Sequence, residues 1–161
     1  MKSTHLFYRA WGLLVAVMLG ACNKGDLTTD SLTSCAGCEF YYQVNAKLDG
    51  WNVAEGKNRV FTYKQGGNGE LSMTSIVHIE VPASLNSFVM EGEEIGNGKV
   101  AYLFSCPYCG VIATEPVDGF IQGQKVADDK WLVDATVELA AVYSGERMGS
   151  IVFKQYFTPR P

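Results

Sequence analysis

The sequence predicts an all-β domain, and three observations support this prediction. Apolar and polar residues alternate with a period of two over two long segments, glycine-rich turn motifs separate the apolar runs, and no amphipathic helical pattern follows the N-terminal segment. The apolar faces of such strands must pack against another sheet or close into a barrel. We therefore expect an antiparallel β-sandwich or small barrel of about seven to nine strands, preceded by an N-terminal signal helix.

The clearest predicted strands cover residues 71–81 and 131–142. In the first, Val77 and its apolar neighbours at every second position share one face, and Pro82 ends the segment. His78 falls on the other, more polar face, so we expect it to be exposed. Shorter candidate strands cover residues 39–48, 52–53, 59–63, 99–105, 111–114 and 151–157, and one short helical turn is possible within 81–89. The aromatic residues expected to fill the core are Phe40, Tyr42, Phe61, Phe104, Trp131, Phe153 and Phe157.

Length and charge limit the class of protein. The chain has 161 residues, of which 19% are charged, and this length suits a single domain. The formal net charge is −4, whereas a general nucleic-acid binder needs positive charge to neutralise phosphates. We therefore expect no nucleic-acid partner.

The first residues have the pattern of a secretory signal. Lys2 and Arg9 precede an apolar run over residues 10–21, which is shorter than the about 20 residues that a membrane-spanning helix needs. Leu19-Gly20-Ala21-Cys22 resembles the bacterial lipobox, in which the chain is cut before a cysteine that carries acyl chains such as palmitate. The resemblance implies a signal peptide over 1–21, a lipidated Cys22 with a flexible tether over 22–34, and one β domain over 35–161.

The layout is also similar to that of uncharacterised small lipoproteins of the Bacteroidota. These combine a lipobox and a short tether with an opening strand that ends in an Ala-x-x-Asp-Gly-x-x-Trp-like element. Here Ala46-Lys47-Leu48-Asp49-Gly50-Trp51 matches except for the position of the tryptophan, and Asp30-Ser31-Leu32 resembles a short O-glycosylation motif of that phylum. The resemblance implies an all-β protein, anchored by lipid in the bacterial cell envelope, at the periplasmic or the outer face of the outer membrane, and it supplies no activity.

Four further cysteines form two Cys-x-x-Cys pairs, Cys35 with Cys38 and Cys106 with Cys109. The exported setting favours disulfides, and a bond from one pair to the other would close a loop of roughly 70 residues, stabilising the fold by about 4 kcal/mol. The spacing fits a structural zinc site of four thiolates equally well, and Cys-Pro-Tyr-Cys-Gly resembles a zinc-ribbon knuckle. The same tetrad occurs in glutaredoxins, but the strand-like residues that follow lack the helix that this redox chemistry requires.

No complete catalytic set accompanies these cysteines. The histidine at 78 has no nucleophile motif of the Gly-x-Ser-x-Gly type in the chain, so we expect no enzyme; a thiol-disulfide oxidoreductase is the nearest enzyme class. Trp51, Tyr63 and Tyr108 lie near predicted turns and could form a stacking surface. Two hypotheses follow. The first is a membrane-anchored domain that binds an envelope protein or a glycan, with no cofactor, and the second is an envelope protein that works through its thiols or through zinc.

Overall fold

The structure is a computed structural model that describes residues 27–66, 72–110 and 112–161. The predicted signal helix and Cys22 lie outside the described residues. In the described part no helix is long and apolar enough to cross a membrane. The eight strands are β1 (Cys38–Asp49), β2 (Asn52–Gly66), β3 (Thr74–Pro82), β4 (Ser87–Glu91), β5 (Val100–Ser105), β6 (Thr114–Ala127), β7 (Lys130–Ala141) and β8 (Arg147–Pro159), and one short helical turn, η1 (Ile95–Lys99), precedes β5. The predicted all-β class and strand number are confirmed.

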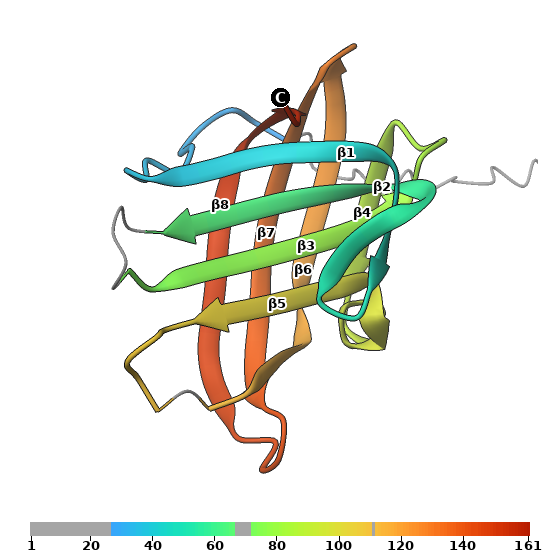
Figure 1. Cartoon of the computed structure of the whole chain (residues 1–161). Helices are drawn as coiled ribbons and strands as arrows, with labels where there is room; N and C mark the ends of the chain where they lie inside the picture. Colours follow the sequence, from blue (N-terminus) through green and yellow to red (C-terminus); the bar gives the residue numbers. More distant parts are fainter. Residues whose placement is uncertain (1–26, 67–71, 111) are drawn as a thin grey trace, which may run out of the picture.

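The strands form two layers, as Figure 1 shows. One layer contains β1, β2, β3 and β5, and its strands run across those of the other layer, which contains β4, β6, β7 and β8. A single sheet with the order β4-β6-β7-β8-β1-β2-β3-β5 folds over to make both layers. The sheet does not close, because β4 and β5 stand at its two ends, so the architecture is a sandwich rather than a barrel.

One pairing departs from the antiparallel pattern that the sequence predicts. At the corner where β8 meets β1, Tyr41 pairs with Thr158 and Tyr42 with Pro159, and here the two strands run in the same direction. The first and the last strand thus meet side by side as the sheet turns from one layer into the other. All other neighbours in the sheet pair antiparallel.

The core between the layers is aromatic. Phe61 of β2 lies at its centre, with its ring centroid 5.2 Å from that of Trp131 and 5.6 Å from that of Phe157. Such edge-to-face pairs add to the stabilisation that comes from area burial. All seven aromatic residues predicted for the core are buried in it or pack against it. The predicted apolar faces lie in the core from Val77 to Val81 and from Trp131 to Ala141, whereas Met73 is 59% exposed. The opposite faces are buried in part, since His78 is 9%, Glu80 8% and Leu132 1% exposed.

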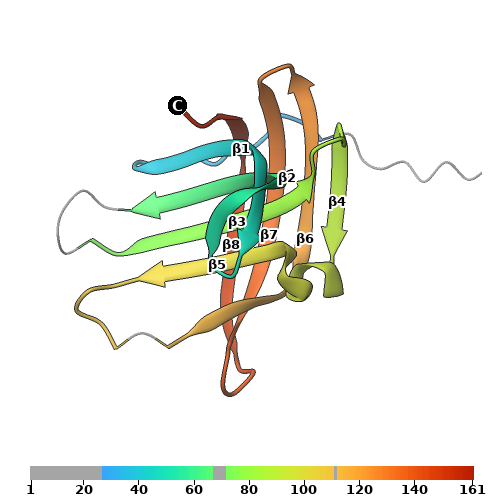
Figure 2. The same cartoon turned by 45° about the vertical axis from the view of Figure 1, so that its right-hand side comes forward.

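The β1–β2 hairpin bends over the outer face of its own layer. A bulge at Ala46 breaks the register between β1 and β2, and the tip of the hairpin then lies across β3 and β5 (Figures 1 and 2). We call residues 46–56 the flap. The carboxylate of Glu80 on β3 holds it, because the Leu48 backbone N–H donates to Glu80 Oε2 at 2.7 Å and Asn58 Nδ2 donates to Glu80 Oε1.

His78 lies on the layer face that the flap covers, and this corrects the expectation that it is exposed. Its exposed fraction is 9%, and its Nδ1 lies 2.9 Å from the hydroxyl of the fully buried Thr62. Burial lowers the pKa of His78 to about 4, so the imidazole is neutral at pH 7. The alternating pattern assigned the correct face to His78, but it could not show that a hairpin folds onto that face.

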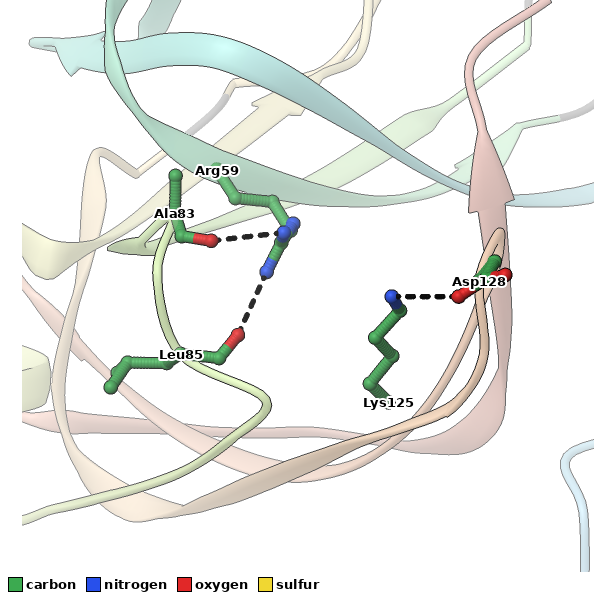
Figure 3. A network of polar contacts seen from close by, with 5 residues as sticks. All are labelled: Arg59, Ala83, Leu85, Lys125 and Asp128. Carbon is green, nitrogen blue, oxygen red and sulfur yellow. Dashed lines mark hydrogen bonds and ion pairs between the residues drawn. The ribbon is translucent and has the colours of Figure 1, made fainter.

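Arg59 closes one end of the sandwich, at the turn between β6 and β7 (Figure 3). The guanidinium lies over the Trp131 ring at 4.5 Å and donates to the carbonyls of Ala83 at 3.1 Å and Leu85 at 3.3 Å. Burial lowers the pKa of Arg59 from its ordinary value. At the turn itself, Lys125 pairs with Asp128 at 3.2 Å. These contacts tie β2 to the segment between β3 and β4 and seal this end of the core.

Thr33, which the sequence assigns to the tether over 22–34, is hydrogen-bonded to β8. Its backbone N–H donates to the carbonyl of Lys154 on β8, and its hydroxyl accepts from the Lys154 N–H, both at 2.8 Å. The Gln155 side chain donates to the Thr33 carbonyl at 3.0 Å. Three hydrogen bonds therefore fix the chain at Thr33, two residues before the expected domain boundary.

Candidate functional site

The four cysteines form two local disulfides. Cys35 is bonded to Cys38 and Cys106 to Cys109, with Cα–Cα distances of 5.5 and 5.4 Å. The sequence left the pairing open, and in the structure each pair lies in a tight turn that brings its own two sulfurs together. A loop of only four residues constrains the unfolded chain less than a long one, and each bond is worth about 2 kcal/mol in the chain-entropy model.

Both disulfides lie at the same end of the layer β1-β2-β3-β5. The Cys35–Cys38 turn precedes β1, where the Gly66 N–H donates to the Gly37 carbonyl at 3.5 Å. The Cys106–Cys109 turn follows β5. Because β2 and β3 lie between β1 and β5, the two turns are three strand spacings apart, on the order of 14 Å. Among the described residues no group of three or more His, Cys, Asp or Glu side chains could hold a metal ion, and the four-thiolate zinc site stays a prediction.

A cleft opens beside β5, at the corner of the sandwich opposite the β1–β8 junction. It consists of two hollows, of about 320 and about 290 Å³, that share the lining residues Tyr102, Phe104, Ile112 and Thr114. We call the two hollows together the seam cleft, because they flank the gap between β5 and the first residues of β6. The connection from β5 to β6, which carries the Cys106–Cys109 turn, borders this gap (Figure 1).

The two hollows differ in the rest of their lining. The outer hollow is also lined by Trp51 at the tip of the flap and by Leu103, which points away from the main core. The inner hollow is also lined by Leu139 and Met148, and Leu139 belongs to the main core. A strand that lay in the gap would therefore direct alternate side chains into the two hollows.

The seam cleft is apolar with one charged group. Glu115 lines the outer hollow, and none of the described residues that line either hollow is basic. Glu115 lies in the first part of β6, where its backbone pairs with Ala140 of β7. At the inner end the Tyr102 hydroxyl lies 3.5 Å from the Ser75 hydroxyl. Burial, helped by the nearby Tyr102, raises the pKa of Tyr63 above its ordinary value, so the Tyr63 phenol is neutral at pH 7.

Exposed aromatic side chains surround the seam cleft. Trp51 at the flap tip is 66% exposed, Tyr108 in the second disulfide turn 79% and Tyr143 in the β7–β8 turn 93%. The exposure of Trp51 and Tyr108 is compatible with the expected stacking surface, which stays a prediction. It is wrong for Tyr63, which is buried in the core and stacks on Phe153 with a centroid distance of 4.6 Å. Large exposed apolar side chains that gather at one place are typical of interaction sites.

Comparisons of the chain with protein-family models, with curated proteins and with solved structures found no match. The seam cleft is therefore interpreted from the residues of this chain. Sequence reasoning missed Glu115, Val142 and Met148 as lining residues. No sequence motif marks these residues, because each is a single residue at a strand end. Only the fold brings the three strand ends together.

Proposed function

We propose that this chain is a lipid-anchored protein of a bacterial cell envelope, in the outer membrane, whose β domain binds an envelope protein or a glycan. The proposal joins two features. The first is the signal pattern that ends in Leu19-Gly20-Ala21-Cys22, with acyl chains on Cys22 as the anchor. The second is the seam cleft, a concave and largely apolar site with few polar groups, which is typical of a binding site.

The exposed tryptophan of the flap is the observation that carries the binding role. A hydrogen-bonded carboxylate, Glu80, holds the flap on the layer, and the flap in turn keeps Trp51 two-thirds exposed at the rim of the outer hollow. Leaving a large indole in water forgoes the stabilisation that burial would give. A partner that covers Trp51 recovers this free energy, so the position of Trp51 favours binding over a purely structural role.

The anchor sets how far the domain reaches. Thr33 is hydrogen-bonded to β8. A flexible tether from Cys22 to this point, as the sequence predicts, would hold the domain on the order of 20 Å from the lipid. A binding site on the domain would then meet partners that lie in the membrane or close to it.

Photo-crosslinking in cells tests the binding role with a matched pair of valines. Val142 lines the outer hollow and is 44% exposed, whereas Val152 lies on the outer face of β8, lines neither hollow and is 61% exposed. A photoreactive amino acid at position 142 is expected to give a discrete adduct in the envelope fraction, and the same amino acid at position 152 is not. Equal adducts at both positions, or none at position 142, would refute the binding role.

The anchor has its own test. The Cys22→Ser variant is expected to lose the mass of the acyl chains and to leave the membrane fraction. Retention of the variant in that fraction at the wild-type level would contradict the lipid anchor and would leave the crosslinking result unaffected.

A further inference from the structure

Resting on the proposed binding role, we propose that the partner of the seam cleft is an extended polypeptide segment with a basic side chain. The segment adds as a strand to the free edge of β5, its basic side chain meets Glu115 and Trp51 in the outer hollow, and its apolar neighbours enter the inner hollow. Three independent features of the described residues support this proposal: the edge, the alternation of the hollows and the charge.

The edge of β5 offers backbone groups to another strand. β5 stands at one end of the sheet and pairs with β3 alone among the described strands. Its pairing with β3 is regular, from Thr74 with Ser105 to Ile79 with Val100, and shows no bulge. β5 also contains no charged residue and no proline, the features with which proteins usually protect an edge strand. An edge strand that lacks these features and has no second strand partner is a template for strand addition.

The two hollows match the side-chain alternation of an added strand. Tyr102 and Phe104 of β5 line both hollows, whereas Leu103 between them lines only the outer one. Successive residues of an extended peptide point to opposite sides. One set of alternate side chains would enter the inner hollow beside Leu139 and Met148, and the other set would enter the outer hollow beside Trp51 and Leu103. A glycan lacks this two-residue period and the backbone donors and acceptors that a strand edge requires.

Charge complementarity selects the side chain in the outer hollow. Glu115 is the one charged residue lining the seam cleft, and no ion pair within the described part of the chain involves it. Trp51 lines the same hollow, and an indole face attracts a cation. A lysine or arginine side chain suits this pair, because its apolar stem can cover Leu103 while its charge meets the carboxylate.

Short capped peptides test the proposal on the full chain purified in detergent. The parent peptide is Gly-Thr-Leu-Lys-Leu-Thr-Gly with a fluorescein label, in which the leucines and the lysine alternate. One control replaces the lysine with glutamate, and a second carries methyl groups on its three central peptide nitrogens. Binding is measured by fluorescence anisotropy, and a change in tryptophan emission that Trp51→Phe abolishes reports whether the peptide reaches the outer hollow.

We expect the N-methylated peptide to bind at least about tenfold more weakly than the parent, because it cannot form the strand hydrogen bonds. The glutamate peptide is expected to bind about five- to tenfold more weakly, with a difference that shrinks at high salt. Glu115→Gln is expected to weaken the parent about two- to fivefold and to remove the preference for lysine over glutamate. Glu91→Gln is the matched control, because Glu91 is an exposed carboxylate on β4, the other edge strand, and the preference is expected to persist in this variant.

Two results would overturn the proposal. The first is equal binding of the parent and N-methylated peptides, which would exclude strand addition. The second is a lysine preference that survives Glu115→Gln, which would place the cation elsewhere. If no peptide binds while crosslinking at position 142 traps a glycan or a protein by another mode, the binding role stands and this inference fails. If neither peptide binding nor a crosslink is found, both fail.

Discussion

His78 makes the stability of the domain depend on pH in a range where few other groups titrate. The chain has two histidines, and the other one, His5, precedes Cys22. In the unfolded chain the pKa of His78 returns to about 6.5, whereas in the folded domain burial holds it at about 4. Both states are neutral above pH 6.5. Between pH 6.5 and 4 the unfolded chain binds a proton that the folded domain does not, so stability falls as the pH falls.

The size of the loss follows from the two pKa values. Each pH unit in this window removes about 1.4 kcal/mol from the free energy of unfolding, so the loss is about 2 kcal/mol at pH 5 and about 3 kcal/mol at pH 4. Urea unfolding followed by the emission of Trp131, which is 1% exposed, measures it. With an ordinary dependence on urea, the midpoint is expected to fall by about 1 M between pH 7 and pH 5.

The His78→Gln variant isolates the histidine from the carboxylates that titrate at the lower end of this range. A glutamine can still accept a hydrogen bond from the Thr62 hydroxyl, which lies 2.9 Å from the imidazole Nδ1. The variant is expected to show a nearly flat free energy of unfolding between pH 7 and pH 5. If wild type and variant lose the same free energy over this window, the buried and neutral state assigned to His78 is refuted.

Three further predictions concern the disulfides, the flap and a close backbone contact. Without reductant the denatured domain is expected to have a mass about four hydrogens below its reduced mass, and Cys106→Ser with Cys109→Ser is expected to lower the free energy of unfolding by about 2 kcal/mol; a native mass that carries zinc would contradict the disulfides. Glu80→Gln is expected to cost about 2 kcal/mol and to speed exchange of the Leu48 amide, because a charged acceptor of two hydrogen bonds is lost, and unchanged exchange would refute the clamp. Gly119→Ala is expected to cost more than about 3 kcal/mol in urea unfolding, since an added Cβ would lie 2.0 Å from the Thr136 carbonyl oxygen. Gly145→Ala, whose Cβ would meet nothing within 4 Å, is the control and is expected to cost about 1 kcal/mol.

The sequence predicts those strands whose two faces differ in polarity. In β3 and β7 one face lies in the core, and the period of two correctly places on it Val77, Ile79 and Val81 and the alternate residues of β7 from Trp131 to Leu139. β6 was missed, because Asp118-Gly119 has the composition of a turn and Pro116 that of a strand end. In the structure these residues form a bulge inside the strand, where Gly119 has a φ of +137° and approaches the backbone of β7.

Gly123 is a second glycine in β6 that makes this strand hard to predict from the sequence. In sequence it weakens the strand pattern, since glycine has a low preference for strands. In the structure it provides room for a neighbour, because a Cβ at this position would lie 2.2 Å from the ring of Phe88 on β4. β4 itself has only five residues, too few for a clear alternation. β4 and β6 thus depend on contacts with each other. The alternation of apolar and polar residues within one strand does not show such contacts.

The candidate site was less predictable than the fold. The cysteines are distinctive in sequence, yet their spacing left the pairing open, and turn geometry decided it in favour of local bonds. Trp51 was noted as a possible binding residue because it lies next to a turn. Glu115 and Met148 carried no such signal. They reach the seam cleft only because β1 and β8 join the two layers at one corner, which places the starts of β6 and β8 beside the edge of β5.

The two ends of the sheet differ in a way that fits a partner at one of them. β4 ends in Glu91, and Glu93 and Glu94 follow directly, so charge discourages another strand from pairing there. β5 has the sequence Val-Ala-Tyr-Leu-Phe-Ser and lacks such protection. An exposed edge strand without such protection can pair with a strand of another chain. The Glu115 carboxylate beside β5 would attract a basic segment and repel an acidic one. The edge would therefore bind basic segments in preference to others. Removing this charge should therefore increase unspecific pairing at β5 while it weakens the specific partner.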